Sequence, residues 1–135
     1  DPPGETYWDT WQRFVEDELL EANLISEADL KLVRLTDSVE EAVDELCGFY
    51  TRYDSMRYVG QRLIVRLRED IDDNLLAAIN AEFDDIVVKG GIERSATTES
   101  EIDDHDKIDL PRLALHFNKS SFSRLRVLID RLNGR

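Results

Sequence analysis

Two six-residue runs, at residues 62–67 and 112–117, share one pattern that limits what this chain can fold into. In both runs apolar side chains occupy every second position, and an amphipathic helical pattern follows after a short polar gap. Alternation of this kind is typical of a strand with one buried face. Each helical pattern has a single apolar stripe and needs a sheet to pack against. The sequence therefore predicts an α+β fold, whether the likeness of the two pieces is a weak internal repeat or chance.

From residue 59 onward the predicted elements are sufficient for a small domain. Strands are predicted at residues 62–67, 92–97 and 112–117, and helices at residues 73–83 and 120–133. Together they predict a two-layer βαββα unit over residues 59–135, with two helices covering one face of three strands. The segment 98–109 is acidic and contains no aromatic residue. It is predicted to be a mobile hairpin loop between the second and third strands.

Residues 1–58 contain only one predicted strand. Capping patterns introduce predicted helices at residues 7–20 and 39–55, and the short branched run 30–35 between them predicts a strand. A single strand is not stable without a partner strand. We therefore expect residues 1–58 to be the helix–strand–helix end of a Rossmann-like nucleotide-binding domain, whose other strands lie outside this chain.

Charge is divided unevenly along the chain. Residues 1–50 hold 14 acids and 3 bases, a net charge of −11, whereas residues 51–135 hold 16 acids and 14 bases, a net charge of −2. Nucleic-acid binding needs a continuous basic surface, so this composition argues against it. No stretch reaches the roughly 20 apolar residues of a membrane helix, and residues 1–20 do not resemble a secretion signal. We expect a cytoplasmic protein with neither a membrane nor a nucleic-acid partner.

No residue pattern predicts a catalytic centre, a metal site or a cofactor. The sequence contains no phosphate loop, dinucleotide fingerprint, nucleophile elbow or zinc module. Asp103-Asp104-His105-Asp106 has metal-ligand residue types, but adjacent residues in a flexible loop rarely converge on one ion. His116 lies between Leu115 and Phe117 and is expected to point away from the core face or toward a subunit contact. Cys47 lies at helical spacing among apolar residues and is expected to be a small core residue.

One segment, residues 49–60, interleaves aromatic residues with arginines and is the candidate ligand site. Arg52, Arg57 and Tyr58 could hold a phosphate or stack on a base, because guanidinium groups pair with phosphate oxygens. The basic run that follows could extend such a site with Arg62, Arg66 and Arg68. The same residue types are typical of buried interfaces, which favours a tyrosine-rich hinge that packs the second domain on the first.

Several stretches of the chain resemble a known family. The residues that carry the resemblance are Tyr7-Trp8-Asp9, Leu24-Ile25-Ser26-Glu27-Ala28-Asp29-Leu30 and Thr36-Asp37-Ser38-Val39-Glu40-Glu41-Ala42-Val43. They resemble the end of the Rossmann-like domain of LOG-type proteins, which are nucleoside 5'-monophosphate phosphoribohydrolases once called lysine decarboxylases. Residues 49–60 and the predicted βαββα unit are similar to a C-terminal extension of some bacterial members. The resemblance implies a parent hydrolase that releases a base and ribose 5-phosphate.

The active-site motif of that family, Pro-Gly-Gly-X-Gly-Thr-X-X-Glu, does not occur in this chain. No catalytic residue is therefore carried over, and we expect the chain to be a non-catalytic C-terminal structural or oligomerisation module. Its expected partners are the N-terminal Rossmann-like domain of the parent and a second copy of the chain. A homodimer would form through Trp8, Trp11 and the unpaired strand 32–35, because apolar patches and strand edges seek partners. The alternative is a regulatory module that binds a small ligand or a nucleotide.

Overall fold

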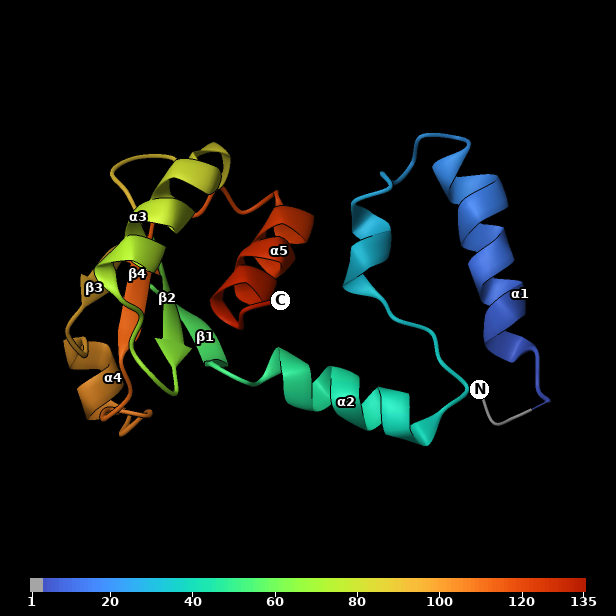
Figure 1. Cartoon of the computed structure of the whole chain (residues 1–135). Helices are drawn as coiled ribbons and strands as arrows, with labels where there is room; N and C mark the ends of the chain where they lie inside the picture. Colours follow the sequence, from blue (N-terminus) through green and yellow to red (C-terminus); the bar gives the residue numbers. More distant parts are fainter. Residues whose placement is uncertain (1–3) are drawn as a thin grey trace. The chain divides into compact units, whose positions relative to one another are not determined.

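The computed structural model describes residues 4–135 and confirms the α+β class (Figure 1). The chain divides into two compact units between Cys47 and Gly48. We call these unit 1, which is described from residue 4 to Cys47, and unit 2, Gly48–Arg135. Residues 48–58, which the sequence analysis assigned to the first domain, belong to unit 2.

All the regular secondary structure described in unit 1 is helical. Its elements are α1 (Tyr7–Phe14), the π-helical η1 (Val15–Leu20), the 3-10 helix η2 (Asp29–Leu32) and most of α2 (Val39–Phe49). The strand predicted at residues 30–35 is wrong. The Asp29 carboxylate accepts hydrogen bonds from the amide and hydroxyl of Ser26, at 2.9 and 2.8 Å, and starts a turn that continues to Leu32. Among the described residues of unit 1 there is no strand that could have paired with this run.

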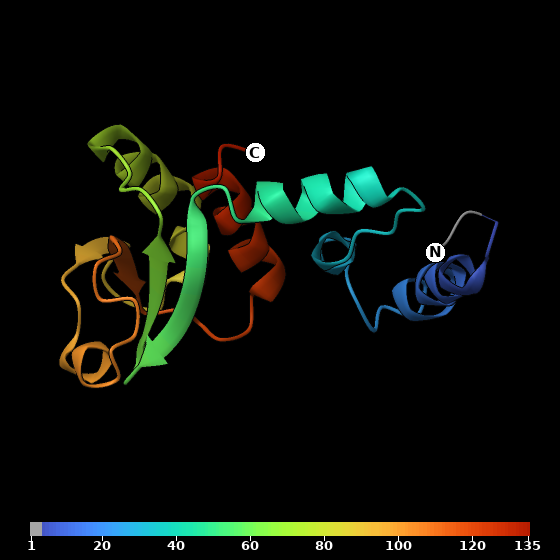
Figure 2. The ribbon, with the colours of Figure 1, turned by 90° about the horizontal axis from the view of Figure 1, so that it is seen from below.

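Unit 2 contains a four-stranded antiparallel sheet. Its strands are β1 (Tyr53–Val59), β2 (Arg62–Leu67), β3 (Glu93–Ser95) and β4 (Arg112–Leu115), in the order β1-β2-β4-β3. The three predicted strands are confirmed, the second and third in shortened form. Most of residues 49–60, which were predicted to be a ligand site or a hinge, form the strand β1. Val59 pairs with Arg62 across a two-residue turn in which Gly60 has a φ of +59°, and the resulting β1–β2 hairpin is visible in Figure 2.

The helices of unit 2 lie on both faces of this sheet. They are α3 (Asp73–Glu82), the 3-10 helix η3 (Asp84–Ile86), α4 (Glu99–Asp103) and α5 (Phe122–Leu132). The core lies between the first face of the sheet and helices α3 and α5, where alternate residues of β2 and β4 meet Ile79, Phe83, Leu128 and Leu132. All four of these helical or helix-flanking side chains are at most 1% exposed. The predicted helices 73–83 and 120–133 are thus confirmed.

The second face of the sheet is covered by the segment that was predicted to be a mobile loop. Residues 98–109 contain α4, whose Glu101 is fully buried. Thr98 caps the helix: its hydroxyl accepts from the Glu101 amide at 3.3 Å, and the Glu101 carboxylate accepts from the Thr98 amide at 3.0 Å. The mobile-loop prediction is therefore wrong, since the segment has regular structure and one of its carboxylates belongs to the interior.

The Asn133 side chain joins the end of α5 to the start of β1. Its oxygen accepts hydrogen bonds from the amides of Arg52 and Tyr53, both at 2.8 Å, and its nitrogen donates to the Phe49 carbonyl at 2.5 Å. These bonds explain why α2 ends at Phe49 rather than at the predicted residue 55. The chain turns there to begin β1.

We expect the substitution Asn133→Ala to lower the free energy of unfolding of unit 2 by about 2–4 kcal/mol, because three backbone groups lose their partner. Hydrogen exchange of the β2 and β4 amides measures this loss. The matched control is Asn74→Ala on the exposed face of α3, which should change stability by at most about 0.5 kcal/mol. Equal effects of the two substitutions would contradict the role given to Asn133.

Candidate functional site: the apolar face of unit 1

Unit 1 leaves most of its large apolar side chains in contact with solvent. Among its described residues the one buried apolar side chain is Val15, which is 6% exposed. Ten large apolar side chains of the same unit are exposed: Tyr7, Trp8, Trp11, Phe14, Leu24, Leu32, Val33, Val39, Val43 and Leu46. Unit 2, by contrast, buries eighteen apolar residues. A monomeric surface rarely carries so much apolar area without a binding role.

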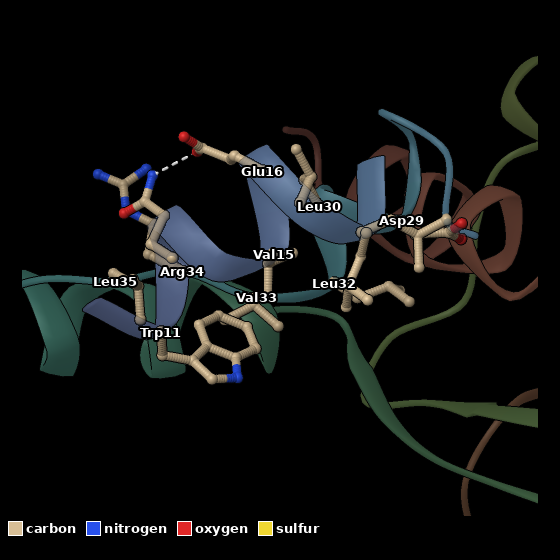
Figure 3. Close-up of a pocket in the computed structure, with 12 residues that line it drawn as sticks. Trp11, Val15, Glu16, Asp29, Leu30, Leu32, Val33, Arg34 and Leu35 are labelled. Carbon is tan, nitrogen blue, oxygen red and sulfur yellow. Dashed lines mark hydrogen bonds between the residues drawn. The ribbon is translucent and has the colours of Figure 1, made fainter. Parts of the chain in front are cut away.

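Part of this apolar surface is hollowed into a groove of about 420 Å³ (Figure 3). It lies between the α1–η1 helix and the segment 29–35. We call it the unit 1 groove and define it by its main apolar residues, Trp11, Val15, Leu19, Leu30, Leu32 and Leu35. The first three lie four residues apart, on one face of the helix. The sequence pattern that predicted the helix therefore also placed these side chains, but it could not show that they stay uncovered.

Aromatic contacts arrange the beginning of α1. The rings of Tyr7 and Trp8 meet edge to face at 5.1 Å between centroids, and those of Trp8 and Trp11 at 5.8 Å. Such arrangements are favoured by the charge distribution of the rings. They hold three large aromatic side chains together on α1, with Trp11 in the groove itself.

The rim of the groove is acidic. Glu16 and Asp29 line it, with Arg34 as the one basic side chain (Figure 3). The Gln12 amide donates to Glu16 at 2.7 Å, which holds that carboxylate beside the groove. Unit 1 contains all 14 acids and 3 bases of residues 1–50, a net charge of −11. The groove therefore suits an apolar surface with a basic border, because opposite charges attract at the rim.

The predicted ligand residues Arg52, Arg57 and Tyr58 have separate partners in unit 2. Arg57 Nη1 forms ion pairs with Asp104 and Asp106, both at 2.9 Å. Arg52 Nη1 donates to the Leu132 carbonyl at 2.9 Å, and the Lys119 ammonium lies over the Tyr58 ring at 5.3 Å. The structure gives each of the three a different contact and does not bring them around a common cavity.

A buried charge cluster, which the sequence analysis missed, lies beneath α4. Glu101 Oε1 is 3.0 Å from Arg66 Nη2 and 2.6 Å from Arg112 Nη1, although the second pair lacks hydrogen-bond geometry. Both arginines are 3% exposed and Glu101 is 0% exposed. Arg66 Nη2 also binds Asp106 at 2.6 Å. Two signals could have indicated this cluster: the Thr98-X-X-Glu101 capping pattern, and the alternation that puts both arginines on the second face.

Several carboxylates of the acidic segment are thus committed to internal ion pairs. Hydrogen bonds from Arg57, which outweigh desolvation, hold the pKa of Asp106 below its usual value. On β1, burial works against ionisation of Asp54, but its contact with Lys107 Nζ at 2.5 Å keeps the pKa of Asp54 lowered. These contacts fasten residues 104–107 to β1 and β2, which is a structural role.

Neither a metal centre nor a membrane span is found in residues 4–135. Within that range no three His, Cys, Asp or Glu side chains are grouped closely enough to hold an ion. The helices described are too short or too polar to cross a bilayer. Cys47, which was expected in the core, is exposed.

No family model matches the chain, and neither a curated protein nor a solved structure matches it. The resemblance to LOG-type proteins thus rests only on the residues quoted for it above.

Proposed function

We propose that this chain is a non-catalytic association module whose unit 1 packs its apolar face on a partner domain. The observation that carries the proposal is the imbalance within unit 1, where ten large apolar side chains are exposed and one is buried. Covering a Leu- or Phe-sized side chain stabilises a protein by about 1.5–3 kcal/mol. Unit 1 thus has much more to gain from a partner than from its own small interior.

The partner that we propose is the Rossmann-like domain of a LOG-type parent. The quoted resemblance points to it, and helices with one apolar stripe are the elements that cover the sheet of such a domain. The acidic rim of the groove favours a partner surface with basic residues at its border. In this proposal the hydrolysis of nucleoside 5'-monophosphates belongs to the partner, because the glycine-rich catalytic motif is not in this sequence.

A second copy of the chain fits the same face less well. Two unit 1 surfaces that each carry a net charge of −11 repel one another. The strand edge that was expected to pair between copies is not a strand. We therefore treat the homodimer as an alternative that the following experiment distinguishes.

The test is isothermal titration of the full chain into a separately produced LOG-type Rossmann-like domain that carries the motif. We expect the substitution Trp11→Asp to weaken binding by at least roughly 30-fold, because buried tryptophans at interface centres contribute about 2 kcal/mol or more. The matched control is Val88→Asp in unit 2, where the valine is 68% exposed. It should leave the affinity unchanged.

Absence of binding by the unaltered chain, or equal affinities of the two variants, would overturn the proposal. Sedimentation of the chain alone separates the remaining case. A dimer that Trp11→Asp dissociates, and that Val88→Asp does not, would assign the face to a second copy.

A further inference from the structure

A second, polar hollow of about 300 Å³ lies in unit 2. Arg62 of β2, Glu93 of β3, His116 just beyond β4 and the loop 89–91 line it. Arg66 pairs with Arg112 at one end of β2 and β4, whereas Leu63 pairs with Leu115 at the other. The hollow is at the latter end, away from the residues that bind α4.

The loop beside the hollow is held at both ends. The Val88 amide donates to the His116 carbonyl at 2.8 Å. The Asn80 side chain accepts from the Ile92 amide and donates to the Ile92 carbonyl, both at 2.8 Å. A Cβ atom on Gly91 would stand 2.7 Å from Asn80 Oδ1, so this clamp requires glycine. Gly90 has a φ of +68°, which also favours glycine. The loop is therefore a fixed structure with exposed backbone.

The hollow is lined by hydrogen-bond donors that have few acceptors within the protein. The amides of Gly90 and Gly91 donate to no other residue in the described part of the chain, and neither does the side chain of Lys89 or His116. Arg62 has an acidic neighbour, Glu93, at the long distance of 3.7 Å. Glu93 is 68% exposed at its side chain, so solvent weakens the pair. Elsewhere in unit 2 arginines such as Arg57, Arg66 and Arg94 have carboxylates within 3.0 Å.

These groups are the ones by which proteins bind phosphate. A guanidinium group pairs with two phosphate oxygens, an ammonium group adds a point charge, and successive amides of a glycine turn form a concave anion site. Three elements that are far apart in the sequence supply them here. Arg62 was predicted in a basic run and His116 on an outward face of its strand, and the fold brings both to Lys89.

We propose that this hollow binds the phosphate group of a small phosphate monoester. Arg62 and Lys89 neutralise the charge, the amides of Gly90 and Gly91 donate to the oxygens, and His116 closes one side. The volume, at the low end for ligand cavities, suits a phosphate with a small attached group. The site is distinct from Arg52, Arg57 and Tyr58 and does not depend on the docking of unit 1.

The test is an NMR titration of the full, ¹⁵N-labelled chain with inorganic phosphate and, in a second arm, with methyl phosphate. Ionic strength is held constant with sodium chloride, because chloride screens charges without matching the phosphate geometry. We expect saturable shifts of the Gly90 and Gly91 amides and of the His116 ring. Arg62→Gln and Lys89→Gln should each weaken binding by roughly tenfold, the effect of losing one charge-assisted hydrogen bond. Arg68→Gln, an exposed arginine outside the hollow, is the matched control.

Shifts that grow linearly with phosphate, or that persist in the Arg62→Gln/Lys89→Gln double variant, would overturn the proposal. Tighter binding of methyl phosphate than of inorganic phosphate would identify the monoester as the ligand class, whereas a preference for inorganic phosphate would refute that part. Trp11→Asp should leave the titration unchanged, so failure of this inference is distinguishable from failure of the docking proposal.

Discussion

Replacing Glu101 by glutamine should lower the free energy of unfolding of unit 2 by about 3–5 kcal/mol, because the substitution breaks a buried ion cluster from one side. The Glu101 side chain has no exposed surface, and its carboxylate faces Arg66 and Arg112 at 3.0 and 2.6 Å. Glutamine keeps the shape but not the charge. Of the two buried guanidinium groups, Arg66 would keep the Asp106 carboxylate, whereas Arg112 would keep only the carbonyls of Leu110 and Lys107.

Hydrogen exchange of the slowest amides in β2 and β4 measures this loss of stability. Glu99→Gln is the matched control, since Glu99 lies on the same short helix with its side chain exposed. Its effect should stay within about 0.5 kcal/mol. A loss below about 1 kcal/mol for Glu101→Gln would show that the cluster contributes no more than a surface pair.

The same carboxylate gives unit 2 a defined acid sensitivity. Burial alone would raise the pKa of Glu101, but hydrogen bonds from Thr98 and Arg66 and the nearby Arg112 guanidinium outweigh it and lower the pKa from 4.5 to about 2. The unfolded chain therefore takes up this proton at a higher pH than the folded chain. The stabilisation is complete above pH 4.5 and is lost as the pH falls through about 2. In Glu101→Gln this component of the pH dependence should be missing, while the components from other carboxylates remain.

The substitution Phe83→Ala is expected to destabilise unit 2 by about 3–5 kcal/mol, because it removes a buried aromatic ring and leaves a cavity. Phe83 is 0% exposed in the core, and the Arg124 guanidinium lies over its ring at 4.6 Å. Phe122→Ala is the matched control in the same unit, since Phe122 is 51% exposed and meets Phe117 edge to face. It should cost at most about 1.5 kcal/mol.

Urea unfolding monitored by far-UV circular dichroism compares the two phenylalanine variants through their midpoints and slopes. Similar decreases in the free energy of unfolding for Phe83→Ala and Phe122→Ala would contradict the location of the core between α3, α5 and the sheet. A large loss from Phe83→Ala alone would agree with that position of the core.

Local patterns predicted much of unit 2 and little of β1. Strands β2 and β4 have apolar residues at every second position, so their period was visible in the sequence. In β1 this signal is blurred, because a register shift between Tyr53 and Ser55 breaks the alternation and because one face carries the polar Ser55 and Arg57. The pairing depends instead on the turn at Gly60, which is itself a hairpin signal in the sequence.

The errors in residues 30–35 and 98–109 have a common physical origin. A short branched run predicts a strand only if another strand is beside it, and the local turn that starts at Ser26 prevailed where none was available. The acidic composition of residues 98–109 predicts that these side chains lie in solvent, unless a buried basic side chain pairs with one of them. Arg66, which binds Glu101, lies 35 residues away in the sequence, so the capping pattern and the strand alternation mark these two residues separately but do not pair them.

Both tryptophans of the chain, Trp8 and Trp11, are on α1, and unit 2 has none. They are 43% and 37% exposed and belong to the face that we expect to be covered. Intrinsic fluorescence excited at the indole band is therefore a label-free optical reporter for this face. A blue shift of the emission on adding a partner would show that the indole rings leave water. A ligand that enters the hollow beside Lys89 would leave the emission spectrum unchanged.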